Sequence, residues 1–509
     1  MNKSNLVLLI AIVGITTSAF AEDWPFWGRD GSRNMVSPEK GIITDFDPGK
    51  YVSPDSEEID IKTTRNVKWV VKLGSQSYGN PTVAGGKVFV GTNNDAPHHK
   101  LFKDDRSLAI CFDEKTGKFL WQLTVPKLGS GKVSDWEYLG ICSSPAVEGD
   151  RVYLVTNRCE VICLDVNGMA NGNQGYDKEG QYMAGPGKPP VEVGPNDADI
   201  IWRFDIRDEL GVFPHNITVT SILVVGDRLY GATSNGVDWT HSETPAPNAP
   251  AFWCVDKKTG KLAGEEFSGI SQGTLHSNWS SPAYGEVDGK GVVILPGGDG
   301  FMYGVDPKPV FDKDEELNVL KELWKIDGNP VKYRKDPKTG KVLKYASGGK
   351  GPSEFISTPV FHKGRIYAAI GQDPEHGEGY GNMLCIDAKT GKAIWQNDKI
   401  ERAISTCAVH EGLVYIADYT GYVYCFDADT GKIHWKHDTQ AHIWPSPLVV
   451  DGQVIIGNED GILTVLATGK EKKLIREIEL DSPVYSSCIA ANGTLYLATH
   501  THLYAIGKK

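Results

Sequence analysis

The sequence predicts an all-β fold, an eight-bladed β-propeller of four-stranded antiparallel blades, closed by an N-terminal strand that joins the C-terminal blade. Three observations predict this fold class. A turn motif recurs along the chain, and a second motif that contains a proline precedes its copies. The 57 glycines and 28 prolines among 509 residues also suit a chain of many short strands and turns.

The turn motif is clearest at residues 385–395 (CIDAKTGKAIW) and 425–435 (CFDADTGKIHW), which are 40 residues apart. Residues 111–121 (CFDEKTGKFLW) repeat it, and residues 254–261 (CVDKKTGK) repeat it without the tryptophan. The alternating residues before the aspartate predict a strand with one buried face. Asp, Thr and Gly predict a tight turn, and we expect the following strand to place its tryptophan against its own blade.

The second motif joins small residues and a proline to an apolar strand, a glycine turn and another strand, which predicts a hairpin. Together the two motifs supply four strands, the content of one propeller blade. Seven blades are the alternative, because the insertions 167–199 and 306–356 obscure the count. We count eight openings, near residues 80, 144, 221, 281, 358, 406, 446 and 487.

The two ends of the chain are expected to share a blade. The last unit ends at residues 504–506 and lacks a fourth strand, whereas residues 66–73 form a spare strand before the first unit. Trp69 in that strand resembles the blade tryptophans. Pairing the two segments would leave no open sheet edge between the ends.

The chain divides into three regions. Residues 1–21 have the features of a signal peptide, with Lys3, an apolar run and a small-x-small site that ends at Ala21. Residues 22–66 form an N-terminal extension, too short for its own core and expected to pack along the propeller of residues 67–507. No later segment is apolar enough to cross a membrane. We therefore expect a periplasmic or secreted protein without a transmembrane segment.

The charge and the cysteines narrow the function classes further. The net charge of -12 and the pI of about 5.6 argue against nucleic acid and anionic membranes as partners. Nine cysteines in an exported chain would suggest disulfides. However, five of them stand two residues before an aspartate in repeat-equivalent strands, which favours buried free thiols.

The CxDxxTGKxxW unit resembles that of the pyrroloquinoline-quinone (PQQ) repeat β-propellers, which include quinoprotein alcohol dehydrogenases and a lipoprotein that assists outer-membrane β-barrel assembly. Residues 24–29 (WPFWGR), 211–216 (GVFPHN) and 371–379 (GQDPEHGEG) are similar to motifs of exported bacterial PQQ-binding-like repeat propellers of unassigned activity. The resemblance implies the fold, but not one activity. The chain also lacks the adjacent cysteines on which the dehydrogenases stack their quinone, and the lipid-anchored cysteine of the lipoprotein.

Propeller sites lie at one mouth of the central channel, on the loops that enter the innermost strands. Aromatic, imidazole and amide groups on these loops suit a flat, oxygen-rich ligand such as a quinone. The alternative for each side chain is that it packs the loops and bonds to backbone. The candidate ligand-binding or cofactor-binding residues are Trp136, His215, Asn216, His276, Asn278, Trp279, Arg402, His442 and Trp444.

A second candidate is a metal site on one loop, formed by Asp373, Glu375, His376 and Glu378. Carboxylate oxygens suit calcium, and the histidine shifts the preference toward a transition metal. The alternative is a solvated acidic insertion.

Two functions fit these observations. The first is an exported scaffold that binds a protein, peptide, glycan or small molecule at its channel mouth. The second is a PQQ-dependent alcohol or sugar dehydrogenase, which the resemblance implies would use bound quinone and calcium. Because no catalytic set is recognisable, we favour the binding scaffold and assign no catalytic residue.

Overall fold

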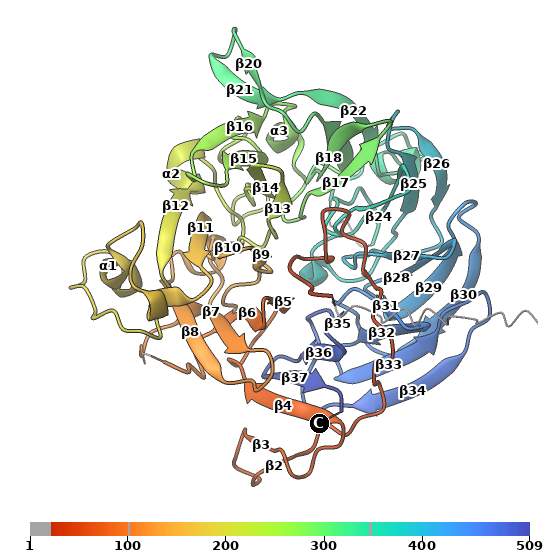
Figure 1. Cartoon of the computed structure of the whole chain (residues 1–509). Coiled ribbons are helices and arrows are strands. Elements are labelled where there is room, and N and C mark those ends of the chain that lie inside the picture. The colour runs from red at the N-terminus through yellow and green to blue at the C-terminus, as the bar shows by residue number, and fades with distance from the viewer. Residues whose placement is uncertain (1–21, 100–101, 346–348, 509) are drawn as a thin grey trace, which may run out of the picture.

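The computed structural model describes residues 22–99, 102–345 and 349–508. The predicted signal peptide, residues 1–21, lies outside the described residues. Eight antiparallel sheets surround a central axis (Figure 1). The predicted eight-bladed, all-β propeller is confirmed, and the seven-bladed alternative is wrong.

The first four blades follow one another along the chain, and each innermost strand lies next to the axis. From inside to outside, their strands are β5 (Thr82–Ala84), β6 (Lys87–Asn93), β7 (Arg106–Asp113) and β8 (Phe119–Pro126); β9 (Ala146–Glu148), β10 (Arg151–Val155), β11 (Glu160–Asp165) and β12 (Ile200–Asp205); β13 (Leu223–Val225), β14 (Arg228–Ala232), β15 (Phe252–Asp256) and β16 (Leu262–Glu266); β17 (Ala283–Val287), β18 (Lys290–Pro296), β19 (Phe301–Val305) and β22 (Glu322–Asp327).

The last four blades repeat this order, and the eighth takes its outer strand from the start of the chain. Their strands are β23 (Val360–His362), β24 (Arg365–Ala369), β25 (Met383–Asp387) and β26 (Ala393–Asn397); β27 (Ala408–His410), β28 (Leu413–Ala417), β29 (Tyr422–Asp427) and β30 (Ile433–Asp438); β31 (Leu448–Val450), β32 (Gln453–Gly457), β33 (Ile462–Ala467) and β34 (Leu474–Glu479); β35 (Ile489–Ala491), β36 (Thr494–Ala498), β37 (His502–Ile506) and β4 (Val67–Lys72).

Short strands and helices lie outside the regular four-stranded blades. They are β1 (Val36–Ser37), β2 (Lys50–Tyr51), β3 (Ile59–Asp60), β20 (Val310–Asp312) and β21 (Leu317–Leu320), the helices α1 (Glu179–Ala184), α2 (Ile206–Leu210), α3 (Ile270–Gly273) and α4 (Val331–Arg334), and the 3-10 turns Gly131–Val133, Gly168–Asn171 and Pro374–His376. No helix of the described residues is long and apolar enough to span a membrane.

The tryptophan of the turn motif joins neighbouring blades. Trp395 of β26 donates its indole N–H to the Ala428 carbonyl of the next blade, at 3.0 Å. Its ring also covers Gly431, where a Cβ atom would lie 2.5 Å from the ring. The prediction that the tryptophan packs against its own blade was therefore incomplete. Its indole also contacts the turn of the following blade. Equivalent indole bonds join Trp69 to Glu114, Trp121 to Val166, Trp202 to Lys257, Trp324 to Ala388 and Trp435 to Gly469.

The third blade lacks this tryptophan, and an insertion replaces it. The hairpin of β20 and β21 extends the sheet, because β21 pairs in parallel with the outermost strand β16. Glu265 lies opposite Val319 and Glu266 opposite Leu320 in this pairing. Backbone hydrogen bonds at this junction thus take the place of an indole contact.

The N-terminal extension lies across one end of the channel, which we call the capped mouth. Its backbone or side chains hydrogen-bond to all eight blades within residues 24–37. Arg33 is fully buried there and donates to the carbonyls of Trp27, Ser221 and Pro282. The blade contacts are Trp24 to Val83, Pro25 to Val147, Arg33 to Ser221, Gly31 to Tyr284, Ser32 to Phe361, Asn34 to Val409, Met35 to Val449 and Ser37 to Ala490.

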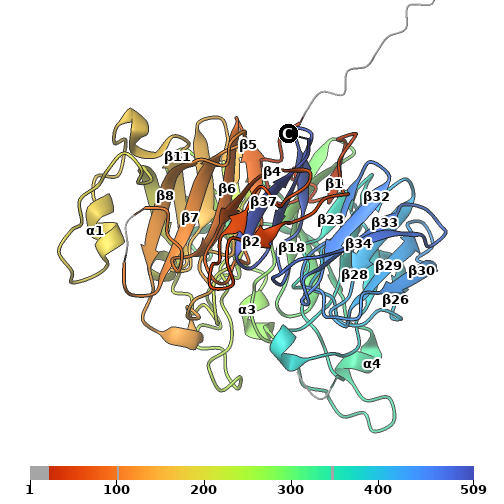
Figure 2. The same cartoon turned by 90° about the horizontal axis from the view of Figure 1, so that it is seen from below.

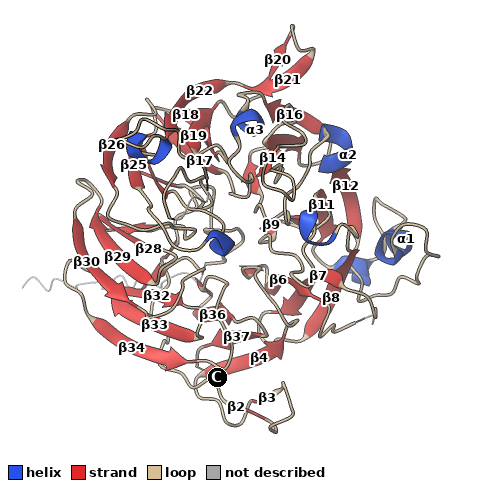
Figure 3. Cartoon of the chain, turned by 180° about the vertical axis from the view of Figure 1, so that it is seen from behind, coloured by secondary structure: helices blue, strands red, loops and turns tan. Residues whose placement is uncertain are grey.

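The opposite end of the channel is built from loops, and we call it the loop mouth. In Figure 2, β1 of the extension lies toward one face, whereas α3 and α4 project from the other. Figure 3 views the ring from behind relative to Figure 1, and loops gather over its centre in this view.

Candidate functional site

Two kinds of connection meet at the loop mouth. The loops that enter the innermost strands carry His215, His276 and Arg402, shortly before β13, β17 and β27. The connections between the second and third strands of a blade end on the same side. They add His241 from the β14–β15 loop and residues 370–382 from the β24–β25 loop.

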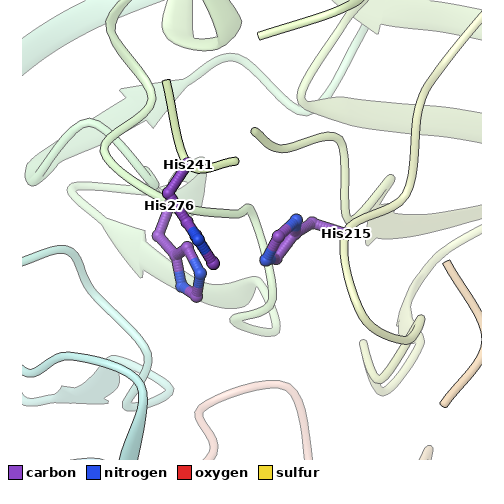
Figure 4. Close-up of side chains that lie close together, drawn as sticks. All are labelled: His215, His241 and His276. Carbon is purple, nitrogen blue, oxygen red and sulfur yellow. The ribbon is translucent and has the colours of Figure 1, made fainter. Parts of the chain in front are cut away.

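Four histidines form the centre of this mouth, and we call His215, His241, His276 and His376 the histidine cluster. The ring of His276 lies 4.4 Å from that of His215, and 5.0 Å from each of His241 and His376. One nitrogen from each of His215, His241 and His276 lies within 4.8 Å of the other two. Figure 4 shows these three side chains pointing toward one another.

The backbone brings the histidines together through short bridges between their loops. Pro214 pairs with Asn235, and Gly236 pairs with Ser277. Gly236 allows this close approach, because a Cβ atom there would lie 2.5 Å from the His276 carbonyl oxygen and 2.7 Å from the His215 Cβ. The geometry of the cluster therefore depends on a residue without a side chain.

The two inner histidines have buried nitrogens without hydrogen bonds. His215 Nδ1 lies 2.7 Å from the Val237 carbonyl, which requires the proton on Nδ1 and leaves a lone pair on Nε2. Among the described residues, His215 Nε2 and both ring nitrogens of His276 have no hydrogen-bond partner. Burial lowers the pKa of His215 to about 4, and burial with three neighbouring imidazoles lowers the pKa of His276 well below 6.5.

Two buried carboxyl groups lie beside His276. Its Nδ1 is 3.9 Å from Glu354 and 3.8 Å from Asp373. Glu354 accepts from the Ser277 amide and the Tyr345 hydroxyl, and burial raises its pKa well above 4.5. Burial raises the pKa of Asp373 as well. The site thus combines basic and acidic groups in surroundings that disfavour charge on both.

The predicted metal residues of the 373–378 loop do not surround one point. Asp373 and His376 lie beside His276, whereas Glu378 lies 3.5 Å from His442. Glu375 is exposed. The loop separates two groups of side chains because it crosses the mouth between them.

Arg402, predicted as a binding residue, holds this loop in place. Its Nη1 donates to the carbonyls of His376, Gly377 and Glu378. The side chain is buried, and its Nε and Nη2 have no hydrogen-bond partner among the described residues. Arg402 therefore positions His376.

A second group of rings, which we call the aromatic cluster, lines the other part of the mouth. Trp444 contacts Tyr78, Tyr419 and Tyr485, with ring centroids 4.9–6.2 Å apart. Glu459 accepts from the Tyr485 hydroxyl and lies 3.1 Å from His442. The cluster consists of Tyr78, Tyr419, His442, Trp444, Tyr485 and His500.

The remaining predicted residues support the loops. Trp279 donates its indole N–H to the carbonyls of His215 and Ile217, and its ring packs edge-on against His276. Asn278 bonds to Asn235, Thr274 and Gly298, and Asn216 donates to Asp373. Trp136 lies under Lys132, and its amide donates to the Asn216 carbonyl.

The sequence reasoning missed His241, Tyr345 and, within the aromatic cluster, Tyr419, Tyr485 and His500. For ligand binding it considered only the loops that enter innermost strands, and among the second-to-third connections it singled out only residues 373–378 as a site. His241 lies in the long β14–β15 connection. The connections between the second and third strands of a blade end at the loop mouth. The length of this insertion was therefore a signal that it contributes to the site.

The rings of the loop mouth already stack on one another, which limits where the quinone implied by the resemblance could stack. A flat quinone needs a free aromatic face on which to stack. Tyr78 stacks on Tyr485 at an interplanar angle of 2°, and Tyr419 stacks on His442 at 8°. The chain also has no pair of adjacent cysteines. One face of each of these four rings is therefore covered by its neighbour, and the cysteine pair on which the dehydrogenases stack their quinone is missing.

Comparisons with known proteins agree on the fold. A family profile described as outer membrane protein assembly factor BamB matches residues 58–168 and 379–474. No curated protein sequence matches the chain.

Solved structures match nearly the whole ring. A europium-containing methanol dehydrogenase is 13% identical with a TM-score of 0.60, over 96% of this chain and 98% of its own. BamB from Moraxella catarrhalis is 12% identical with a TM-score of 0.52, over 87% of this chain and 97% of its own. At these identities the likeness concerns the fold alone.

Proposed function

We propose that this chain, a member of the PQQ-repeat β-propellers, is an exported binding protein that holds its ligand at the loop mouth. The observation that carries this proposal is the difference between the two mouths. The N-terminal extension hydrogen-bonds to every blade at one end of the channel. The loop mouth, which the extension leaves uncovered, is therefore the end at which we expect the ligand to bind.

The side chains of the loop mouth support a polar ligand. Imidazoles and carboxyl groups of the histidine cluster offer hydrogen bonds, and the aromatic cluster offers ring edges beside Glu459. The indole nitrogen of Trp444 has no hydrogen-bond partner among the described residues, so it is available as a donor. Sites of this kind combine a few placed polar groups with aromatic surface.

The test uses the purified chain from residue 22 and two sets of probes, soluble hexasaccharides of different linkage and a library of short peptides. We expect one set to bind, as measured by calorimetry, and Trp444→Ala to weaken this binding at least tenfold. Phe311→Ala is the matched control, because Phe311 is 61% exposed on the β20–β21 hairpin. Equal affinity of Trp444→Ala and the unchanged protein would contradict the proposal.

The same preparation separates binding from quinone chemistry. We expect no dye-linked oxidation of an alcohol and sugar panel after incubation with PQQ and calcium. Stoichiometric quinone binding with turnover would overturn the proposal in favour of a dehydrogenase.

A further inference from the structure

The histidine cluster carries a more specific inference than ligand binding. Buried polar atoms are normally hydrogen-bonded, and each one left without a partner costs about 1–3 kcal/mol. Four such atoms, His215 Nε2, the two ring nitrogens of His276 and His376 Nδ1, lie in one small region of the loop mouth. Packing alone gives no reason for the unsatisfied nitrogens to face a third imidazole, His241.

We propose that His215, His241 and His276 bind a divalent transition-metal ion such as Zn²⁺. Three imidazoles are a donor set that zinc, copper and cobalt accept and that calcium and magnesium do not. The inference deepens the proposed function, on which it rests for access to the mouth. The metal would offer the ligand an open coordination position.

The tautomer of His215 is already set for coordination. Metal-binding histidines commonly donate their other ring N–H to a carbonyl or carboxylate, which fixes the ring. His215 Nδ1 makes this bond with the Val237 carbonyl at 2.7 Å, so Nε2 faces the cluster as a free lone pair. Tyr345 stacks on His276 and Trp279 packs edge-on against it, which limits its rotation.

The spacing is close to that of a loaded site. Zn–N distances of about 2.0–2.1 Å in a tetrahedron place ligand nitrogens about 3.3 Å apart. The three nitrogens already lie within 4.8 Å of one another, so binding requires them to close by at most about 1.5 Å. His241 is exposed and can make most of this movement.

Two carboxyl groups lie close enough to His276 to offset the charge of a bound ion. Three neutral imidazoles leave a divalent ion with two positive charges, which are costly in a buried site unless they are paired. Glu354 and Asp373 are buried at 3.9 Å and 3.8 Å from His276 Nδ1 and supply two negative charges when ionised. A bound cation favours the ionised form of both carboxyl groups.

The direct test is metal titration of the chelator-treated protein from residue 22. We expect one equivalent of Zn²⁺ by calorimetry and visible absorption bands for the Co²⁺ form. The Cu²⁺ form should show nitrogen hyperfine splitting in its paramagnetic resonance spectrum, which reports imidazole ligands independently of affinity.

Two variants and one control locate the site. His241→Ala removes an exposed ligand without disturbing the core, and His276→Phe keeps a ring between Tyr345 and Trp279. We expect each variant to weaken Zn²⁺ binding at least about 100-fold. Loss of a residue that only supports a metal ligand already weakens binding by up to about 100-fold, and these variants remove a ligand itself. His410→Ala is the control. It also removes an imidazole, but His410 lies in β27 near the capped mouth, away from the histidine cluster.

Two results would overturn the proposal: a protein that binds none of the three metals stoichiometrically, or wild-type affinity in both His241→Ala and His276→Phe. Binding of saccharide or peptide probes to metal-free protein, with no effect of Zn²⁺, would remove the metal proposal and leave the binding function in place. If the protein binds Zn²⁺ but none of the saccharide or peptide probes, the binding function falls and the metal site stands.

Discussion

At the scale of single residues, Gly236 determines whether the histidines can meet. A methyl group at this position would lie 2.5 Å from the His276 carbonyl oxygen, so the two loops must separate. We predict that Gly236→Ala weakens Zn²⁺ binding at least tenfold although all histidines remain. Calorimetric titration of the folded variant measures this effect.

Gly194→Ala is the control for this change, because a Cβ atom there meets only Asp197 Oδ2, at 3.9 Å. We expect it to bind metal as the unchanged protein does. If Gly236→Ala also binds metal with unchanged affinity, the spacing of the histidines does not matter and the site is elsewhere.

Asp299 gives a prediction on pH. Burial raises its pKa from 3.8 to about 6, against the opposing effect of hydrogen bonds from Tyr303 and Phe301. Because the folded state holds the proton more tightly, this residue's contribution to stability is greatest below pH 3.8 and is lost as the pH rises to 6. The loss relative to Asp299→Asn should be about 3 kcal/mol.

Urea unfolding of both proteins between pH 3.8 and 7 measures this difference. Other titrating groups cancel in the comparison, since they are common to the two proteins. A difference in unfolding free energy that does not change with pH would show that Asp299 has an ordinary pKa.

At the scale of elements, the turn motif is a device for joining blades. Trp395 is 9% exposed and connects β26 to the Ala428 carbonyl of the next blade. We predict that Trp395→Ala destabilises the protein by about 3–5 kcal/mol, because it leaves a cavity and removes one of the three donors to the Ala428 carbonyl. Trp239→Ala, at a 53% exposed tryptophan, should cost less than about 0.5 kcal/mol.

Thermal unfolding of the two variants makes the comparison. Equal shifts in the unfolding midpoint would mean that the indole contact between blades contributes nothing beyond the loss of a tryptophan.

The sequence was most informative at this scale. Each innermost strand begins two residues after its predicted opening, as β5 does at Thr82 and β35 at Ile489. The motif repeats because each blade faces the same packing problem, so local residues suffice to reveal it. The parallel pairing of β21 with β16 was not predictable, since it joins an insertion to a strand about 50 residues earlier and no repeat announces it.

At the scale of the whole molecule, the N-terminal extension connects all eight blades. Arg33 is fully buried in this connection and has three carbonyl acceptors. We predict that Arg33→Ala lowers the unfolding free energy by about 3 kcal/mol or more, because each buried carbonyl without a donor costs about 1–3 kcal/mol. Protease cleavage within residues 22–47 should become faster.

Metal affinity should not change in this variant, because Arg33 lies at the capped mouth and the histidines lie at the other. Loss of metal binding together with stability would indicate that the extension controls the site as well as the ring. Unfolding, limited proteolysis and calorimetry on one preparation distinguish these outcomes.

The site was only partly predictable from the sequence. His215, His276, Asp373 and His376 were named for two separate sites, whereas the structure gathers them into one. Loops from blades that are distant in sequence meet at the mouth. No local sequence pattern predicts which of these loops contact one another. His241 was not predicted, because it belongs to an insertion outside the repeat.

A metal ion at the centre of the histidine cluster is the feature that most needs a direct test. Diffraction from crystals of the chelator-treated protein soaked in Co²⁺, recorded on both sides of the cobalt absorption edge, tests it directly. We predict one strong anomalous peak within bonding distance of His215, His241 and His276. Peaks only at surface histidines such as His410, or no peak at the loop mouth, would contradict the account.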